Sequence, residues 1–510
     1  MRVQMYRKLV KNTLFNGAAF GLTALLGLIT APLIINQWGI EAFGLIILAR
    51  AFLPGGLISL FDPALSETTA MVIARARQNE LWKAADQGLP ALTLIATGTG
   101  LTLAILVTLA ATPLIQFLNV PERLQDDFAP LVQLSALVLL LAFPALVADG
   151  VMRGYERFDL VRLNEVAFQL LFVLSVVALA LSNGAFLWIA YGYILIITLR
   201  SGVAILLALR LLRRHERRLA APGPWARAYV IRQSFLLTQN KFFGGILPLL
   251  IPPLISAMLG PASLAIYDVL MRIPRFVKVL AGLIPSALLP VAARLQQKSN
   301  KAELGLAGRV GLLILPAVTL PFIGAFAGSS ESLLRLWIGA SMAPYWPWLS
   351  LAFVPLAFGQ INNVPGVLMA ADPAALKRNN LVTLCYTACW FVLGFALVPV
   401  FKEFAFIASA SFAALLSFPW RLKIIQNALM IELGEAMPRL LVLLVTMLFT
   451  VIVSRLSSLA LNANTLLSVI VSIPLAGSIS TLLLYIFYLT SGERQLVQKV
   501  ILIGHSNREC

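Results

Sequence analysis

Four ionisable residues share one helical face inside a long apolar stretch of the sequence. They are Asp268, Arg272, Arg275 and Lys278, which fall on one face at 100° per residue. A charge near the middle of a membrane costs at least about 2.5 kcal/mol, so such residues usually face water or a partner of opposite charge. Arginine binds phosphate through two parallel hydrogen bonds and keeps its charge when buried. The spacing therefore indicates a binding site for a ligand that carries phosphate, with Asp268 one turn before Arg272 and able to pair with it.

Other ionisable residues in apolar stretches extend this candidate site. Arg50 lies roughly 10 Å from the outer end of a predicted helix. Lys241 lies near the inner end of another helix, where its amine can reach the lipid headgroups. We assign both residues, together with the three cations of the stripe, to ligand binding. Asp62 and Asp268 are the candidates for binding a coupling ion, either a proton or sodium.

Signatures of catalysis and of cofactor binding are missing from the sequence. The chain has no GxxxxGK[ST] phosphate loop, so it does not encode a nucleotide-driven pump. Its two histidines, His215 and His505, lie in hydrophilic segments, and its three cysteines show no metal-ligand spacing. We therefore expect no catalytic residue, no metal and no cofactor, and we do not expect an enzyme.

The composition predicts a membrane protein. Of the 510 residues, 60% are hydrophobic and 12% are charged, which is about half the charged fraction of a soluble protein. Such a chain cannot cover a soluble domain with solvated side chains, which excludes a soluble enzyme and a disordered scaffold. The net charge of +17 would suit nucleic acid, but the cations lie in short clusters between apolar stretches, as in membrane proteins. We expect no nucleic-acid partner.

Apolar stretches long enough to cross a membrane recur along the chain. A spanning helix needs about 20 predominantly apolar residues, and the sequence predicts an all-α polytopic protein with about fourteen such helices. Four cations precede the first stretch, but that stretch is too long for a signal peptide. The predicted spans are 14–36, 43–66, 88–112, 129–150, 163–182, 186–209, 234–258, 264–290, 305–327, 346–370, 379–400, 404–420, 438–458 and 465–489.

The distribution of Lys and Arg predicts the orientation of these helices. Of the 39 such residues, 29 fall in segments on one side of the predicted membrane, 4 on the other side and 6 within the spans. Because positive residues accumulate on the cytoplasmic side, both termini are predicted to be cytoplasmic. Residues 210–232 form the longest polar stretch, which we interpret as a basic cytoplasmic linker in contact with anionic lipid headgroups.

Two stretches on either side of this linker resemble each other. Residues 32–50 read PLIINQWGIEAFGLIILAR and residues 253–272 read PLISAMLGPASLAIYDVLMR. Both begin with PLI, have a glycine seven residues after the proline and end with arginine; chance similarity between apolar helices is the alternative explanation. We expect two related lobes of six helices. The predicted domains are an N-terminal lobe (1–209), the linker (210–232), a C-terminal lobe (233–430), and two appended helices with a cytoplasmic tail (431–510).

Several motifs resemble those of a known family. The opening NGAAFGLTALLGLITAPLIINQWGIEAFGL is similar to the first two helices of bacterial O-antigen and polysaccharide flippases. These proteins belong to the multidrug/oligosaccharidyl-lipid/polysaccharide exporter superfamily. The resemblance spans nearly the whole chain and rests on Gly, Pro and the charge pattern. Further similar stretches are LAIYDVLMRIPRFVKVLAGLIPSALLPVAARL (264–295), LLRLWIGASMAP (333–344) and NNVPGVLMAADPAALKRNN (362–380).

The resemblance implies a V-shaped, two-lobed transporter that works by alternating access. It implies that a polyprenyl-pyrophosphate-linked oligosaccharide, a repeat unit of O-antigen, lipopolysaccharide or another surface polysaccharide, is turned from the cytoplasmic to the periplasmic leaflet. The expected location is the bacterial inner membrane. The expected partners are this lipid-linked oligosaccharide, membrane lipids and polysaccharide polymerase machinery.

Three alternatives remain open from the sequence. The positive stripe disfavours a drug/cation antiporter of the same superfamily. The lack of a deep histidine or carboxylate pair disfavours a membrane-embedded glycan-modifying enzyme. A flippase for a lipid-linked peptidoglycan precursor would use the same chemistry, and the sequence does not separate it from a polysaccharide flippase.

Overall fold

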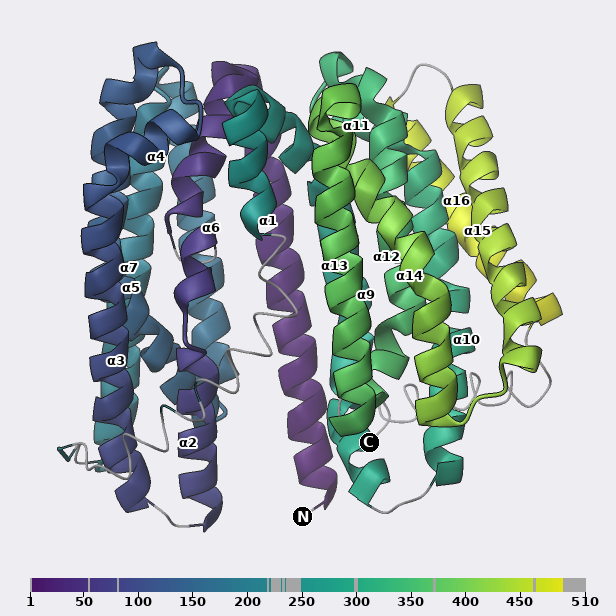
Figure 1. Ribbon diagram of the computed structural model, residues 1–510, viewed down its shortest axis with the longest axis horizontal. Coiled ribbons are helices and arrows are strands. Elements are labelled where there is room, and N and C mark those ends of the chain that lie inside the picture. Colours follow the sequence, from purple (N-terminus) through teal and green to yellow (C-terminus); the bar gives the residue numbers. More distant parts are fainter. Residues whose placement is uncertain are drawn as a thin grey trace. The chain divides into compact units, whose positions relative to one another are not determined.

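The computed structural model shows an all-helical protein (Figure 1). Every regular element among the described residues is a helix, which confirms the predicted all-α membrane fold. Contacts divide the chain into two units: the first is Met1–Val279 with Val398–Phe404, and the second is Leu280–Leu397 with Ala405–Cys510. The described residues are 2–53, 56–79, 82–217, 220–221, 231, 234, 249–297, 301–369, 373–461 and 465–488.

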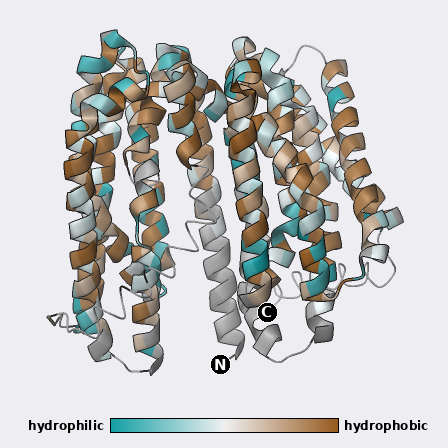
Figure 2. Cartoon of the chain, in the orientation of Figure 1, coloured by the Kyte–Doolittle hydropathy of each residue, from teal (hydrophilic) through white to brown (hydrophobic). Residues whose placement is uncertain are grey.

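The first unit contains most of the N-terminal helices and the beginning of the helix that carries the charged stripe. Its longest elements are apolar along much of their length (Figure 2). The elements are α1 (Arg2–Ala51), a short 3-10 helix (Leu57–Phe61), α2 (Leu65–Asn79), α3 (Trp82–Leu109), α4 (Ala111–Phe117), α5 (Glu122–Gly154), α6 (Phe158–Leu181), α7 (Leu187–Arg214), the helical segment Leu249–Leu259, and α9 (Pro261–Gln297) as far as Val279.

Two glycines interrupt helices at matching places in the sequence repeat. Gly39 has φ 87° and ψ 168° and divides α1 into two helices joined at a kink. Gly260 has φ 86° and separates the segment Leu249–Leu259 from α9. Residues with a side chain rarely adopt such a positive φ, so both positions require glycine. Their shared conformation supports the predicted relation between the two PLI stretches.

The second predicted span, 43–66, is wrong as a continuous helix. The second part of α1 ends at Ala51, and α2 begins only at Leu65, with the short 3-10 helix between them. The sequence reads PGG at positions 54–56. Proline lacks the amide hydrogen that a helix needs, and glycine loses the most conformational entropy on ordering, so these residue types disfavour a continuous helix.

Ten helical stretches in the described residues are long and apolar enough to cross a membrane. One of them, Ala374–Leu429, contains two successive helices, and α9 with its charged stripe is not among the ten. The predicted span 234–258 lies partly outside the described residues, which include its first residue and its last part, the helical segment Leu249–Leu259. The total of fourteen spans stays a prediction.

Small residues let helices of the first unit approach each other closely. Gly150 and Gly154 on α5 lie against α2, and a Cβ at Gly150 would overlap the backbone of Ser66. Such a GxxxG spacing is typical of packing between membrane helices. Gly44 on α1 lies against the backbone of Pro261 in the same way. This last contact places the second part of α1 beside the beginning of α9, where the charged stripe starts.

The second unit packs its two C-terminal helices against α10. Gly324 and Gly328 on α10 face the backbone of Met447 and Val451 on α15, again with GxxxG spacing. The two helices predicted as an appended pair are thus part of the packed unit. The elements are the remainder of α9, α10 (Lys301–Gly328), α11 (Ser330–Trp337), a 3-10 helix (Ala340–Tyr345), α12 (Trp346–Met369), α13 (Pro373–Phe401) as far as Leu397, α14 (Ala405–Leu429), α15 (Leu433–Ala460), α16 (Thr465–Leu483) and a π-helical turn (Leu484–Tyr488). The last residues of α13 and the 3-10 helix Lys402–Phe404 belong to the first unit.

The two contact units do not coincide with the lobes predicted from the sequence. Contacts group the described residues 249–279 with the first unit, whereas the repeat assigns them to the C-terminal lobe. A contact unit is defined by packing and a lobe by an internal repeat, so the two divisions describe different properties. The predicted lobes stay a prediction.

Candidate functional site: a cationic cluster on α9

Asp268 lies between two arginines of α9. Its Oδ2 accepts a hydrogen bond from Arg272 Nε at 2.7 Å, as the spacing predicts, and its Oδ1 accepts one from Arg275 Nη1 at 2.8 Å. The side chains of Asp268 and Arg272 are 10% and 13% exposed, whereas that of Arg275 is 47% exposed. A guanidinium has five N–H donors. Arg275 therefore offers donors to a ligand even while it is paired with Asp268.

Arg272 ties α9 to both parts of α1. Its Nη1 donates a hydrogen bond to the Gly27 carbonyl oxygen at 2.7 Å, and its guanidinium carbon lies 4.7 Å from the centre of the Phe43 ring. Gly27 precedes the kink of α1 and Phe43 follows it. Since Asp268, a backbone carbonyl and an aromatic ring all hold the same guanidinium, Arg272 has little freedom to turn toward a ligand. Its contacts are those of a residue that positions the two helices.

Arg50 joins this cluster from the second part of α1. Its guanidinium carbon lies 4.9 Å from the centre of the Tyr193 ring of α7, a cation–π contact. Arg50 also interacts electrostatically with Asp268 and with Arg272. Arg50 and Arg272 are the arginines that close the two PLI stretches. The fold thus brings together two residues that are far apart in the chain.

Lys278 completes the positive surface of α9. Its side chain is exposed, and it feels the charge of Arg275 one turn away. Like charges at this spacing repel each other. We call Arg50, Asp268, Arg272, Arg275 and Lys278 the α9 cluster; its four cations face one carboxylate, so it carries a surplus of three positive charges. A bound anion would relieve this repulsion.

The other predicted site residues lie outside this cluster. Asp62 is buried, and its Oδ1 accepts a hydrogen bond from the backbone N–H of Leu65 at 3.0 Å, at the start of α2. A carboxylate in this position caps a helix N-terminus. Its contact therefore gives a structural reason for the residue, and ion coupling by Asp62 stays a prediction. Lys241 lies outside the described residues.

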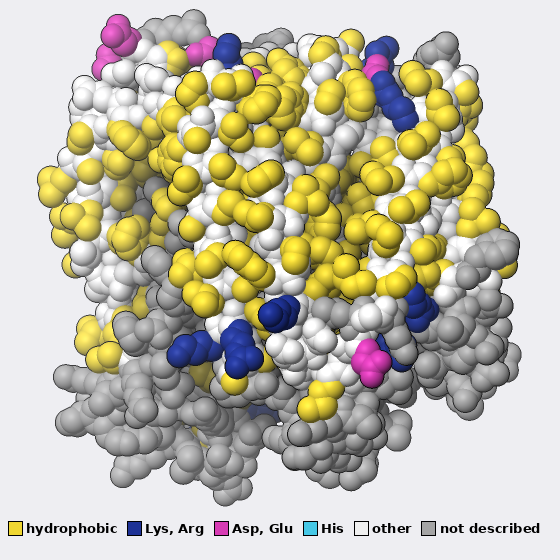
Figure 3. Space-filling view, turned by 45° about the vertical axis from the view of Figure 1, so that its right-hand side comes forward, with side chains coloured by type: hydrophobic (Ala, Val, Ile, Leu, Met, Phe, Trp, Pro, Cys, Tyr) yellow, Lys and Arg dark blue, Asp and Glu magenta, His cyan; other side chains and the backbone are white. Residues whose placement is uncertain are grey.

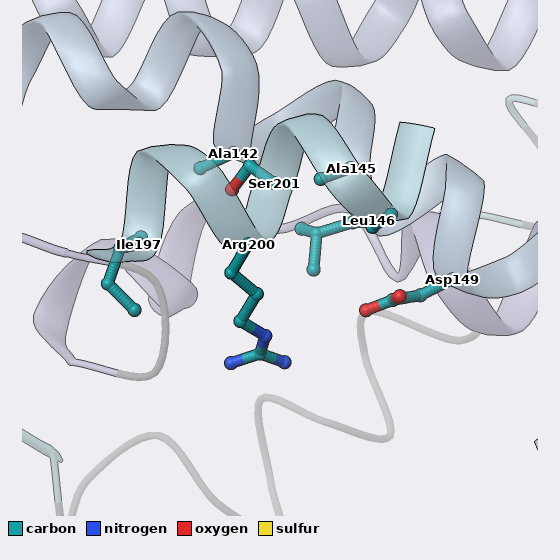
Figure 4. A pocket seen from close by; sticks show the side chains of 8 residues that line it. Ala142, Ala145, Leu146, Asp149, Ile197, Arg200 and Ser201 are labelled. Carbon is teal, nitrogen blue, oxygen red and sulfur yellow. The ribbon is translucent and has the colours of Figure 1, made fainter. Parts of the chain in front are cut away.

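Sequence reasoning missed a second group of charges between α5, α6 and α7. Arg200 Nη2 lies 3.2 Å from Glu165 Oε1, and Glu165 also pairs with Arg162. Arg200 and Asp149 line a small cavity of about 50 Å³, and Figure 4 shows both side chains reaching into the same space. Asp149 also interacts electrostatically with Arg153, so three arginines and two carboxylates lie here. Glu165 was missed because it stands at the polar end of a predicted span, where a charge needs no explanation.

The first residues after α7 are docked on neighbouring helices. The Arg217 guanidinium carbon lies 4.0 Å from the Trp82 ring centre, and the His215 ring stacks on Tyr155 at 4.4 Å. Burial raises the pKa of the Tyr155 phenol, so this ring stays uncharged at neutral pH. The first five residues of the predicted basic linker (210–214) thus belong to α7, and the next ones pack against protein. About half of the linker lies outside the described residues.

Metal binding has no candidate in the described part of the chain. Within the described ranges, no group of three or more His, Cys, Asp or Glu side chains is placed to hold a metal ion. The chemistry that the α9 cluster offers is the binding of an anion by arginine and lysine.

The fold is that of solved membrane transporters. A structure of the lipid II flippase MurJ in an inward closed conformation matches with a TM-score of 0.70 and 12% identity, over 95% of this chain and 99% of that one. An inward-facing multidrug resistance MATE family transporter of the MOP superfamily matches with a TM-score of 0.60 and 14% identity, over 82% and 95%. A MOP superfamily transporter from Pyrococcus furiosus matches with a TM-score of 0.55 and 14% identity, over 83% and 96%. At these identities the likeness concerns the fold alone.

The sequence itself assigns the family. Residues 9–296, more than half of the chain, match the polysaccharide biosynthesis protein family. The protein belongs to this family, which confirms the resemblance found in its motifs. The matched region includes Arg50 and the whole stripe from Asp268 to Lys278. No curated protein sequence matches the chain.

Proposed function

We propose that the protein is a flippase for a polyprenyl-pyrophosphate-linked oligosaccharide, the repeat unit of O-antigen or another surface polysaccharide. It would move this lipid from the cytoplasmic to the periplasmic leaflet of the bacterial inner membrane by alternating access. The observation that carries the proposal is the surplus of positive charge in the α9 cluster, in a chain of the polysaccharide biosynthesis protein family. A pyrophosphate diester bears two negative charges and matches such a site.

The contacts suggest different roles for the cations of the cluster. Arg275 and Lys278 are exposed and would contact the pyrophosphate, with Arg50 beside them. Arg272 would hold α9 against α1, because its donors already face Asp268 and Gly27. Asp268 would offset the electrostatic repulsion between the two arginines, because it pairs with both. A coupling-ion role for Asp268 finds less support, since both of its carboxylate oxygens already accept hydrogen bonds from arginines.

The membrane potential supplies a driving force for this transport. The interior of a cell is electrically negative, so moving an anion outward is favourable by about 2.3 kcal/mol per charge per 100 mV. A substrate with two phosphate charges would benefit twice. The polyprenyl chain would stay in the lipid phase while the charged headgroup crosses.

Complementation tests the proposal directly. The full chain is expressed in a strain that lacks its own polysaccharide flippase, and surface glycan and intracellular lipid-linked intermediate are measured. We expect surface glycan to return and the intermediate to fall. The double variant Arg275→Gln/Lys278→Gln should insert normally and fail to restore glycan. The matched control Arg335→Gln/Lys402→Gln removes two cations elsewhere in the chain and should restore it.

A lipid-linked peptidoglycan precursor is the second candidate substrate. The fold match to the lipid II flippase MurJ over nearly the whole chain favours it, and the pyrophosphate chemistry is the same. Rescue of a strain depleted of its lipid II flippase, without rescue of surface glycan, would select this substrate. Correct insertion without either rescue, but with gained drug resistance, would instead indicate a drug/cation antiporter.

A further inference from the structure

Four basic residues gather at one end of the helix pair α13 and α14 in the second unit. Lys377 and Arg378 lie in the first turns of α13, and Arg421 and Lys423 lie in the last third of α14. Three of them are exposed, and Arg421 is half-buried. Figure 3 shows Lys and Arg side chains gathered along the lower border of a continuous apolar surface. We call these four residues the inner basic patch, because the charge distribution predicts this end to be cytoplasmic.

The inner basic patch forms no ion pair within the described ranges. Among the described residues, no carboxylate forms an ion pair with any of its four members. The guanidinium carbon of Arg421 lies 5.6 Å from the centre of the Tyr386 ring of α13, which cannot neutralise it. A half-buried charge without a counter-ion is costly. A bound anion would supply the counter-charge that the described residues do not provide.

Two arginines elsewhere in the same unit form ion pairs within the protein. At the other end of the unit, Arg335 and Arg455 both pair with Glu331, at 3.0 and 2.6 Å. The contrast shows that the unit can pair its arginines when it carries a carboxylate nearby. Neither α13 nor α14 contains an Asp or a Glu. The positive charge of the inner basic patch is therefore not offset by a carboxylate on its own two helices.

The surroundings of the patch place it at the border of the lipid. Trp420, next to Arg421, is 55% exposed, and Leu381 and Leu416 are 61% and 52% exposed. Exposed leucines on a membrane helix face acyl chains, and tryptophan is enriched at the level of the headgroups. The four cations therefore lie at the level of the phospholipid phosphates. The apolar surface directly above them faces the acyl chains of the same lipids.

We propose that the inner basic patch is a binding site for the phosphate headgroup of an anionic phospholipid in the predicted cytoplasmic leaflet. Arg421 and Lys423 would bind the phosphate, with the Arg421 guanidinium held in place on Tyr386. Lys377 and Arg378 would attract the headgroup from the aqueous side. The apolar residues above would receive the acyl chains. Basic pockets between membrane helices on this side bind anionic headgroups in this manner.

Native mass spectrometry of the full chain in detergent tests this site. The protein is incubated with equal amounts of phosphatidylglycerol and phosphatidylcholine, and the retained lipid is counted. We expect preferential retention of phosphatidylglycerol. The triple variant Lys377→Gln/Arg378→Gln/Lys423→Gln changes only exposed side chains. It should lower the ratio of retained phosphatidylglycerol to phosphatidylcholine about fivefold for each removed charge that contacts the headgroup, which corresponds to roughly 1 kcal/mol per charge. Arg421→Gln should reduce it further.

The control and a competition experiment separate the possible ligands. The variant Lys402→Gln removes an exposed cation directly after the opposite end of α13 and should keep the full preference. Equal retention of phosphatidylglycerol by the triple variant and the unaltered chain would overturn the proposal. Displacement of the lipid by millimolar inorganic phosphate would also overturn it, because the patch would then be a general phosphate site rather than a lipid site.

Discussion

Two regions of the molecule combine one carboxylate with two arginines and an aromatic ring. In the first unit, Asp268 pairs with Arg272 and Arg275, and Arg272 lies over a phenylalanine. In the second unit, Glu331 pairs with Arg335 and Arg455, and Arg455 lies over Trp346 at 4.2 Å. In both, the carboxylate and one arginine are four residues apart on the same helix.

The two regions differ in what surrounds the shared arrangement. The Glu331 cluster joins α11 to α15 beside hydroxyl pairs such as Ser329 with Ser454 at 2.7 Å, and its surplus is a single positive charge. The α9 cluster includes the further cations Arg50 and Lys278. The same local pairing of one carboxylate with two arginines therefore holds helices together in the Glu331 cluster, where the charges nearly balance. In the α9 cluster, where cations are in excess, it can also attract an anion.

The largest effect is expected from removing both arginines of α9. Arg272→Ala/Arg275→Ala should abolish export of the lipid-linked glycan while the protein still inserts into the membrane. It removes two of the positive charges and leaves Asp268 without partners. Surface glycan measured by complementation, with membrane abundance measured by immunoblot, provides the check. Normal export by this variant would contradict the site assignment.

Removing the carboxylate of the α9 cluster should have the opposite effect on binding. Asp268→Asn raises the positive surplus by one charge, which at about 7 Å and an effective dielectric constant of 20 favours an anion by roughly 2 kcal/mol. We expect at least tenfold tighter binding of undecaprenyl pyrophosphate to the purified protein and slower export, because release is hindered. Asp268→Glu keeps the charge and should bind like the unaltered chain. Weaker binding by Asp268→Asn would assign the carboxylate a purely structural role.

A single exposed cation should matter less than either change. Lys278→Gln is expected to weaken pyrophosphate binding several-fold without changing the thermal unfolding midpoint, since the side chain is exposed. Arg335→Gln, an exposed cation of the Glu331 cluster, should leave binding unchanged. Equal effects of the two substitutions would mean that the charge surplus does not distinguish the clusters.

The smallest effect on transport is expected in the Glu331 cluster. Glu331→Gln leaves Arg455 without its ion pair and should lower the thermal unfolding midpoint by a few degrees, because charged hydrogen bonds contribute about 1.5–3 kcal/mol. Export should persist at the level of the unaltered chain. A loss of export with an unchanged unfolding midpoint would instead give this cluster a direct functional role and remove the contrast with α9.

Local spacing allowed part of the candidate site to be predicted from the sequence. Asp268 and Arg272 are four residues apart, so any helix brings them together, and the hydrogen bond between them follows from helical geometry. The apolar stretches predicted the membrane helices for the same reason. The break after Ala51 was missed because the prediction relied on the mean hydropathy of the stretch and gave no weight to the helix-disfavouring PGG sequence.

The sequence by itself determined the membrane class, the helical content, the family and the positions of the stripe along α9. These depend on composition and on contacts within one helix. Only the tertiary structure decided that Arg272 is held by Gly27 and that Arg50 joins the cluster. It also decided that Arg275 stays exposed. These properties depend on contacts between residues more than 200 positions apart, and such contacts follow from close packing at sites such as Gly44 against Pro261, which no local pattern encodes.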